Sequence, residues 1–343
     1  MALLSWSVLV LAFASSVVAD VKIRVVTWNV KDNEWADDGF TDESIDDVLG
    51  LNKGGELASI YAVGLQENCW SCDDDELPEI GSKFLARISR KARAGYEFVG
   101  IYGTRMSGYC EWKCKFGTHG TTLVLVIAKK GLVTGAQKFH QNDDCSSKTI
   151  PNSEKGVAAL KVRIANGKTL CFGSNHLDSS KASYRRSCLK DFFRNADKDV
   201  DWSSSCDAQF LFGDFNTRTG DKGDGPSNGK HVPRGTNFNS LRQRDELIGS
   251  QPYGTGSDWN SNLLNYINKV QRKTFRECPF SFMPSYSLKE SSKYCNGGFP
   301  CYRTNRPMSW TDRIIFTSGK CLKYDAIYAE YGDHFPVFAE FAL

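Results

Sequence analysis

Short apolar runs recur along the chain and predict β-strands. Residues 21–26 alternate charged and apolar side chains, which is typical of a strand with one buried face. Further strand-like runs occupy residues 59–65, 121–128, 157–164, 169–173, 209–212, 310–316 and 336–341. Apolar residues at helical spacing predict helices from Ile80 to a stop near Gly95 and across residues 184–196 and 262–270. Strands and helices therefore mix, with strands in the majority.

The first nineteen residues are uncharged and mostly apolar, and they end in the sequence Ser-Val-Val-Ala. This pattern predicts a cleaved signal peptide over residues 1–19 and a mature chain over residues 20–343. A membrane anchor is the alternative, but Ser15 and Ser16 interrupt the run, and a bilayer requires roughly 20 apolar residues. No second apolar segment of that length follows, so we expect a secreted protein without a transmembrane segment.

Twelve cysteines, an even number, indicate disulfide bonds in a chain that is expected to be secreted. Cys69 and Cys72 resemble half a zinc site, but no second pair of this kind and no nearby histidine pair completes it, so a local bridge is favoured. The net charge is only +3, and the acidic residues 37–47 offset the basic residues 87–93, so charge identifies no partner. We interpret both charged runs as solvated faces and expect a monomer.

Polar clusters follow several of the strand-like runs, and their order predicts one shared site. They are Thr27-Trp28-Asn29, Gln66-Glu67-Asn68, Asn175-His176-Leu177, Gly213-Asp214-Phe215-Asn216, Trp310-Thr311-Asp312-Arg313 and Gly332-Asp333-His334. Because a domain boundary between Asn29 and His334 would divide this site, one catalytic domain is expected over residues 20–343. The segments 220–235 and 142–153 are expected to be surface loops.

The carboxylates and amides of these clusters predict hydrolysis of a phosphate ester. That reaction requires an in-line nucleophile and charge neutralisation on the phosphoryl oxygens. Glu67 ends an apolar run and is a hard oxygen ligand of the kind that Mg²⁺ prefers, and Asn29 can orient that ligand. Asp214 can accept the proton of the attacking water while Asn216 holds the water or a phosphoryl oxygen. A Gly-Asp turn with a left-handed asparagine is the alternative interpretation of this cluster.

Asp312 and His334 are expected to form a complementary pair. A carboxylate bonded to one imidazole nitrogen favours the charged ring, so the other nitrogen can hold a phosphate oxygen. His176 follows another strand-like run and is expected to be a second cationic or hydrogen-bonding contact.

These motifs resemble the endonuclease/exonuclease/phosphatase superfamily, and within it the inositol polyphosphate 5-phosphatases, over nearly all of the mature chain. The resemblance rests on Trp28-Asn29-Val30, on residues 63–67, on Lys155-Gly156-Val157-Ala158, and above all on a Phe-x-Pro-x-Tyr element at 282–286 followed by Arg306 to Arg313. Simple nucleases of the superfamily generally lack that element. The resemblance implies a deoxyribonuclease-like α/β fold, a four-layer sandwich of two stacked, mostly antiparallel β-sheets flanked by α-helices.

The resemblance also implies Mg²⁺ as the cofactor and an inositol phosphate or phosphoinositide as the substrate. The implied metal-site residues are Glu67, Asn29 and Asp333. The implied catalytic residues, which activate or position water or contact the scissile phosphate, are Asp214, Asn216, His334, Asp312 and His176. The implied substrate contacts are Lys155, Tyr286, Lys289, Lys293 and Arg306.

Departures from the family pattern leave alternatives open. Ser287 stands directly after Tyr286, where family members usually carry a lysine, and the nearest lysine is Lys289. Phe215 and Phe335 look more like secreted nucleases or sphingomyelinases. A secreted nuclease that binds nucleic acid on the same catalytic core is therefore one alternative. A binding protein is another, because a secreted relative of the 5-phosphatases is a haem carrier.

Overall fold

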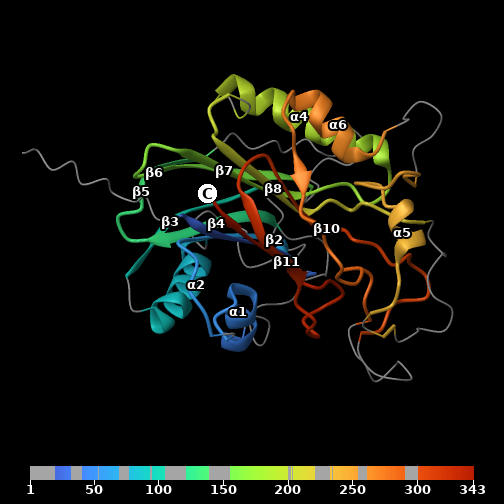
Figure 1. Ribbon diagram of the computed structural model, residues 1–343, viewed down its shortest axis with the longest axis horizontal. Helices are drawn as coiled ribbons and strands as arrows, with labels where there is room; N and C mark the ends of the chain where they lie inside the picture. The colour runs from blue at the N-terminus through green and yellow to red at the C-terminus, as the bar shows by residue number, and fades with distance from the viewer. Residues whose placement is uncertain are drawn as a thin grey trace, which may run out of the picture.

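Two stacked β-sheets form the centre of the molecule (Figure 1). The computed structural model describes residues 20–31, 41–52, 54–68, 77–92, 95–104, 121–138, 155–199, 202, 204–220, 232–233, 235–253, 261–289 and 300–343. Within these residues, each sheet contains six strands. The strands of sheet A, in order across it, are β11 (Lys320–Ala326), β12 (Val337–Ala342), β1 (Lys22–Asn29), β2 (Ile60–Asn68), β4 (Thr121–Lys129) and β3 (Tyr96–Gly103). Those of sheet B are β5 (Val133–Lys138), β6 (Gly156–Ile164), β7 (Thr169–His176), β8 (Ala208–Asp214), β10 (Asp312–Phe316) and β9 (Arg276–Glu277).

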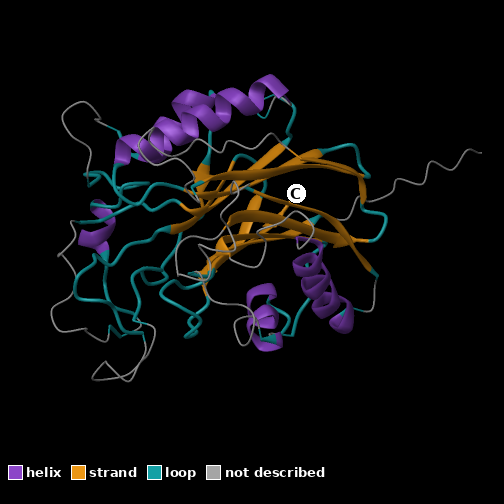
Figure 2. Ribbon diagram, turned by 180° about the vertical axis from the view of Figure 1, so that it is seen from behind, coloured by secondary structure: helices purple, strands orange, loops and turns teal. Residues whose placement is uncertain are grey.

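Helices cover the outer face of each sheet, which gives four layers (Figure 2). On sheet A lie α1 (Asp42–Leu49) and α2 (Leu77–Lys91), and on sheet B lie α4 (Ala182–Asp199) and α6 (Leu263–Gln271). The short helix α5 (Asn239–Gln243) precedes α6 in the chain. This arrangement confirms the predicted sandwich, and the sheets are mixed because each contains one parallel pair.

The parallel pairs, β1 with β2 and β7 with β8, lie near the middle of their sheets, and the remaining pairings are antiparallel. Strands covered on both faces read as near-continuous apolar runs, and every residue of β7 and β8 is buried. One apolar cluster fills the space between the sheets, and two others lie between each sheet and its helices. The carboxyl ends of both central pairs therefore rest on a tightly packed core.

The predicted strands and the three predicted helices are present, with ends shifted by a few residues. Strands β3, β5, β9 and β11 and helices α1 and α5 were not predicted. The interpretation of the acidic and basic runs as solvated faces is wrong where they meet. Arg87 Nε donates to Asp46 Oδ1 at 2.7 Å, and Asp46 is only 4% exposed. This ion pair joins α1 to α2. The predicted loop 142–153 and most of 220–235 lie outside the described residues.

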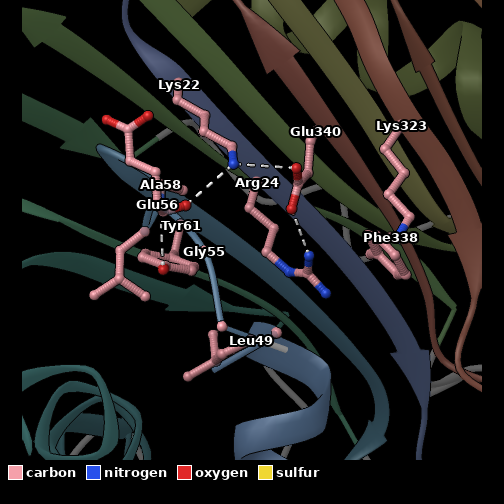
Figure 3. Close-up of a pocket in the computed structure, with 13 residues that line it drawn as sticks. Lys22, Arg24, Leu49, Gly55, Glu56, Ala58, Tyr61, Lys323, Phe338 and Glu340 are labelled. Carbon is pink, nitrogen blue, oxygen red and sulfur yellow. Dashed lines mark hydrogen bonds and ion pairs between the residues drawn. The ribbon is translucent and has the colours of Figure 1, made fainter. Parts of the chain in front are cut away.

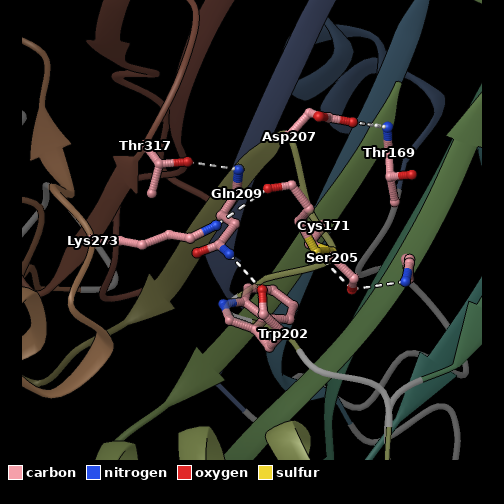
Figure 4. The surroundings of a disulfide bond; sticks show 10 residues. Thr169, Cys171, Trp202, Ser205, Asp207, Gln209, Lys273 and Thr317 are labelled. Atoms are coloured by element: carbon pink, nitrogen blue, oxygen red, sulfur yellow. Dashed lines mark hydrogen bonds between the residues drawn. A yellow bond between two sulfur atoms is a disulfide. The ribbon is translucent and has the colours of Figure 1, made fainter. Parts of the chain in front are cut away.

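All six described cysteines form disulfide bonds, as predicted, and the other six lie outside the described residues. Cys171 on β7 bonds to Cys206, just before β8 (Figure 4). Cys278, after β9, bonds to Cys321 on β11, so this bridge joins the edge of sheet B to the edge of sheet A. No helix in the described part of the chain is long and apolar enough to cross a bilayer.

Candidate active site

Side chains from both sheets meet where the two parallel strand pairs end. Asn29 and Glu67 stand at the carboxyl ends of β1 and β2. His176 and Asp214 stand at the ends of β7 and β8, where they are register partners. Because strands in a parallel pair end at the same edge, residues far apart in sequence come together there. The predicted residues Asn29, Glu67, His176 and Asp214 thus lie in one cluster.

This cluster has the donor atoms of a cation site. Ligand atoms of Glu67, His176 and Asp214 all lie within 4.8 Å of one another. His176 Nε2 is 3.4 Å from Glu67 Oε1 and 3.5 Å from Asp214 Oδ2. Asn29 Nδ2 donates to both carboxylates at 3.1 Å. Two carboxylates and an imidazole at this spacing can bind a divalent cation, and carboxylate oxygens suit Mg²⁺, so these residues fit a divalent metal.

Asp214 is buried, with 1% of its surface exposed. Burial raises the pKa of Asp214 above its ordinary value, and the charge of Asp312, its register partner on β10, raises it further. The positive charges of His334, Lys155 and Arg218 act in the opposite direction. A carboxyl group with a raised pKa is a stronger base than an exposed one.

Asn216 is held rigidly two residues beyond Asp214. Its backbone φ is +50°, in the left-handed region, so the turn predicted as an alternative for this cluster does occur. Asn216 Nδ2 donates to Leu177 O at 2.8 Å and lies 3.2 Å from Asp214 Oδ2. Arg218 Nη2 donates to Asn216 Oδ1 at 2.6 Å. The side-chain amide is therefore fixed beside the carboxylate, so the turn and the functional interpretation do not exclude each other.

Asp312 and His334 form the expected pair. His334 Nδ1 lies 2.8 Å from Asp312 Oδ2, which also accepts from Ser285 Oγ at 2.7 Å and Thr311 Oγ1 at 2.9 Å. Burial lowers the pKa of His334, but the charge and hydrogen bond of Asp312 outweigh burial and raise it to about 10. The ring is therefore cationic at neutral pH, and Nε2 remains to contact an anion. Sequence reasoning missed Ser285 and Thr311, although Ser285 lies inside the Phe-x-Pro-x-Tyr element.

Asp333 lies on the other side of His334. Its Oδ1 is 4.0 Å from His334 Nε2, and its Oδ2 is 3.3 Å from Arg303 Nη2. The cluster of three possible ligands in the described chain does not include Asp333, so a role for it at the metal stays a prediction. Sequence reasoning also missed Arg303, whose backbone N–H donates to Ser287 O at 2.9 Å.

The predicted substrate contacts are spread more widely. Lys155 Nζ is 3.3 Å from His176 Nδ1. The ring of Tyr286 lies between the imidazole of His334, with centroids 4.6 Å apart, and the guanidinium of Arg218, 4.8 Å from its centroid. Half-buried positions are occupied by Lys289 and Arg306, and Lys293 lies outside the described residues. Lys155 and Tyr286 thus adjoin the cluster directly.

Comparisons with known proteins agree with the fold. A sequence model described as Endonuclease/Exonuclease/phosphatase family 2 matches residues 26–340. A search of curated proteins found no match. Among solved structures, the inositol polyphosphate 5-phosphatase domain of SPsynaptojanin, in complex with inositol (1,4)-bisphosphate and a calcium ion, has 19% identity and a TM-score of 0.62, and covers 94% of this chain and 84% of that one.

Two other solved structures share the fold. A Cimex nitrophorin, as a ferrous NO complex, has 18% identity and a TM-score of 0.60, and covers 94% of this chain and 98% of that one. ANGEL2, a 2',3'-cyclic phosphatase, has 12% identity and a TM-score of 0.52, and covers 95% and 96%. At these identities the likeness extends to the fold alone.

Proposed function

Since the chain belongs to endonuclease/exonuclease/phosphatase family 2, we propose that it is a secreted, Mg²⁺-dependent phosphatase that removes the 5-phosphate of an inositol phosphate or phosphoinositide. One observation carries this proposal. Glu67, His176 and Asp214 gather their ligand atoms within 4.8 Å, and the Asp312–His334 pair adds a cationic ring that acts on Asp214 electrostatically. This arrangement supplies a base, a cation site and an anion contact together.

The residues divide the hydrolysis among them. Asp214 accepts a proton from the attacking water, and the amide of Asn216 orients that water. The water oxygen forms a bond to phosphorus, the bond between phosphorus and the ester oxygen breaks, and the leaving alkoxide takes a proton from water. His334 donates Nε2–H to a phosphoryl oxygen while Asp312 keeps the ring charged. Mg²⁺ held by Glu67, beside Asn29 and His176, would neutralise charge on the phosphoryl oxygens, and Asp333 is a further candidate ligand.

Support for the substrate class comes from the SPsynaptojanin domain, whose structure contains inositol (1,4)-bisphosphate. In this chain, Lys155 and Arg303 place cations beside His176 and Asp333, which suits a substrate with several phosphates. Lys289, Lys293 and Arg306 are further candidate contacts. The disulfide bonds among the described cysteines support secretion, because such bonds persist in oxidising compartments.

The nitrophorin match means that the fold alone does not separate an enzyme from a binding protein. The buried carboxylates and the Asp312–His334 pair favour the enzyme, because a haem carrier has no use for a hydrolytic base. A nuclease would use the same core, but its affinity for DNA would fall steeply as salt rises.

A phosphate-release assay tests the proposal. Purified protein is given soluble inositol phosphates, phosphoinositide vesicles and plasmid DNA, each with Mg²⁺ and with EDTA. We expect phosphate release from an inositol substrate in Mg²⁺ and none in EDTA. Glu67→Gln should lose activity when Mg²⁺ is limiting, and a higher Mg²⁺ concentration should restore part of that activity. Full turnover in EDTA would contradict the metal. Efficient DNA cleavage without phosphate release would favour the nuclease, and a Soret band on purification would favour the haem carrier.

A further inference from the structure

We propose that a buried ion pair between Arg185 and Glu246 is a positioning device for Asn216. The inference rests on the proposed function, because it concerns the residue that orients the attacking water. Arg185, on α4, is 3% exposed, and Glu246, in the segment after α5, is fully buried. An ion pair with so little solvent contact contributes little net stability against an apolar pair of the same size, so a role in fixing geometry is the more economical explanation.

The arginine joins the carboxylate to the exit of β7. Arg185 Nε donates to Glu246 Oε1 at 2.9 Å, and its Nη2 donates to Oε2, so the pair is bidentate. Arg185 Nη1 donates to Asp178 O at 2.7 Å. Asp178 directly follows Leu177, whose carbonyl accepts from Asn216 Nδ2. One support of the Asn216 amide is therefore fixed through Arg185.

The glutamate holds the other support. Glu246 Oε2 accepts from the backbone N–H of Arg218 at 3.3 Å, and the backbone N–H of Glu246 donates to Arg218 O at 3.1 Å. Arg218 in turn donates through Nη2 to Asn216 Oδ1 at 2.6 Å. The Nδ2 and Oδ1 atoms of Asn216 are therefore both connected, through two or three contacts each, to the Arg185–Glu246 ion pair.

The backbone conformation of Asn216 explains why its side chain would need such support. A residue other than glycine with φ of +50° lies in the left-handed region, and contacts to its side chain and to the neighbouring backbone help to hold it there. If the ion pair is removed, the turn at 216–218 can relax, and the amide moves away from Asp214 Oδ2. Removing one partner alone would leave a buried charge and risk unfolding, so the test removes both.

The test variant is Arg185→Met with Glu246→Met. A milder variant, Arg185→Met with Glu246→Gln, keeps an acceptor for the N–H of Arg218 and serves if the first fails to fold. The matched control is Arg24→Met with Glu340→Gln, which removes a second ion pair.

The control pair lies on the outer face of sheet A, beside a cavity of about 260 Å³ (Figure 3). Arg24 Nη1 is 2.8 Å from Glu340 Oε1, and the two side chains are 5% and 20% exposed. Arg24 precedes Asn29 by five residues on β1, roughly 17 Å at the rise of a strand. Its removal should therefore affect stability without reaching the site.

The kinetic experiment measures inositol trisphosphate hydrolysis with saturating Mg²⁺, well below each melting temperature. We expect the Met/Met variant to lower kcat by about tenfold to a hundredfold and to change KM by less than about threefold. The variant with Glu246→Gln should recover part of the lost kcat. The control should keep kcat within about twofold of the parent protein. In an Asn216→Ala background, the same two changes should lower kcat by less than about threefold. A full-size loss in that background would overturn the inference.

Hydrogen exchange gives a readout that needs no catalysis. The N–H of Asn216 donates to Asp214 Oδ1 at 2.7 Å, and that of Arg218 donates to Glu246. Exchange in a peptide spanning residues 214–220 should be faster in the Met/Met variant, or in the Gln variant if it is used instead, and unchanged in the control. Unchanged exchange in the test variant would overturn the inference. If exchange responds as expected but the parent protein hydrolyses no phosphate ester, the proposed function fails and the structural part of the inference stands.

Discussion

Asp214 is subject to opposing electrostatic effects. Burial and the facing carboxylate of Asp312 raise its pKa, and three hydrogen bonds, from Asn29 Nδ2, Asn216 N and Asn216 Nδ2, favour its charged form. A side chain in this situation changes its protonation readily when a cation or a substrate arrives. That property suits a general base. Replacing Asp214 should therefore lower kcat more than it changes KM.

We expect Asp214→Asn to lower kcat by about a hundredfold or more with little change in KM, because the amide cannot accept the proton of water while neighbouring contacts to phosphate remain. Steady-state phosphate release at saturating Mg²⁺ measures this, so that a weakened metal site does not obscure the result. A variant with a near-normal rate would remove Asp214 from the mechanism.

His334 should make stability depend on pH through Asp312. The pKa of His334 is raised from 6.5 to about 10, so the charged ring stabilises the fold below about pH 6.5, and this contribution is lost as pH rises through 10. Asp312→Asn removes the largest of the effects that raise that pKa, so the pKa of His334 should fall. In urea unfolding with EDTA, the parent protein should lose more stability between pH 6.5 and 10 than Asp312→Asn does. Equal pH dependence in both proteins would argue against a charged His334.

Among the structural elements, most with an apolar pattern were predicted, but β3 and α1 were missed although both contain apolar residues. Strand β5 has an exposed sequence at the edge of sheet B, so no alternation marks it. Helix α1 was hidden in an acidic run, although Ile45, Val48 and Leu49 follow helical spacing and Thr41 caps its first turn. A cap followed by this spacing was a signal that sequence reasoning could have used.

The candidate site was predictable to the extent that its residues end strands. Asn29, Glu67, His176 and Asp214 do so; strand pairing brings them together within each sheet, and the stacking of the two sheets brings the two pairs together. Arg303 and the Arg185–Glu246 pair depend on contacts between segments far apart in sequence, and no local pattern marks such contacts. The roles proposed for individual residues remain predictions that the kinetic experiments test.

The strand end at Gly213 offers a sharp test of how β8 positions Asp214. A side chain at Gly213, where φ is +145°, would place Cβ 2.0 Å from the carbonyl oxygen of Asn175, which is backbone and cannot give way easily. Gly213→Ala should therefore cost more than about 2 kcal/mol of unfolding free energy and lower kcat.

Gly135 on β5 is the control for this substitution, because a Cβ there meets no atom within 4 Å. Urea denaturation should find Gly135→Ala within about 0.5 kcal/mol of the parent protein. Equal stability for the two alanine variants would contradict the close approach of β8 to β7 at this point.

At the scale of the whole molecule, disulfide bonds differ in which parts of the fold they connect. Within the described chain, Cys278–Cys321 joins the edges of the sheets, whereas Cys171–Cys206 joins neighbours inside sheet B. The closed loops span 43 and 35 residues, so chain entropy alone predicts losses that differ by only about 0.2 kcal/mol.

We expect Cys278→Ser with Cys321→Ser to lower the free energy of unfolding more than Cys171→Ser with Cys206→Ser does. The two losses should differ by about 1 kcal/mol more than chain entropy predicts. The reason is that hydrogen bonds between β7 and β8 still hold positions 171 and 206 close together when the disulfide between them is lost. Guanidinium denaturation of the two double variants measures this difference. Equal losses would mean that the bridge between the sheets acts only by shortening the unfolded chain.

The pairing of β1 with β12 also constrains how the protein is made. Arg24 and Glu340 are 316 residues apart, yet they face each other across adjacent strands. A ribosome releases β1 well before β12, so until β12 emerges β1 has an open edge of unpaired backbone groups. Exposed edges of this kind recruit other strands, and slow translation or a stop before residue 337 would leave nascent chains prone to aggregation. Termination just before β12 should therefore lower the yield of folded protein sharply, although nearly all of both sheets has then been made.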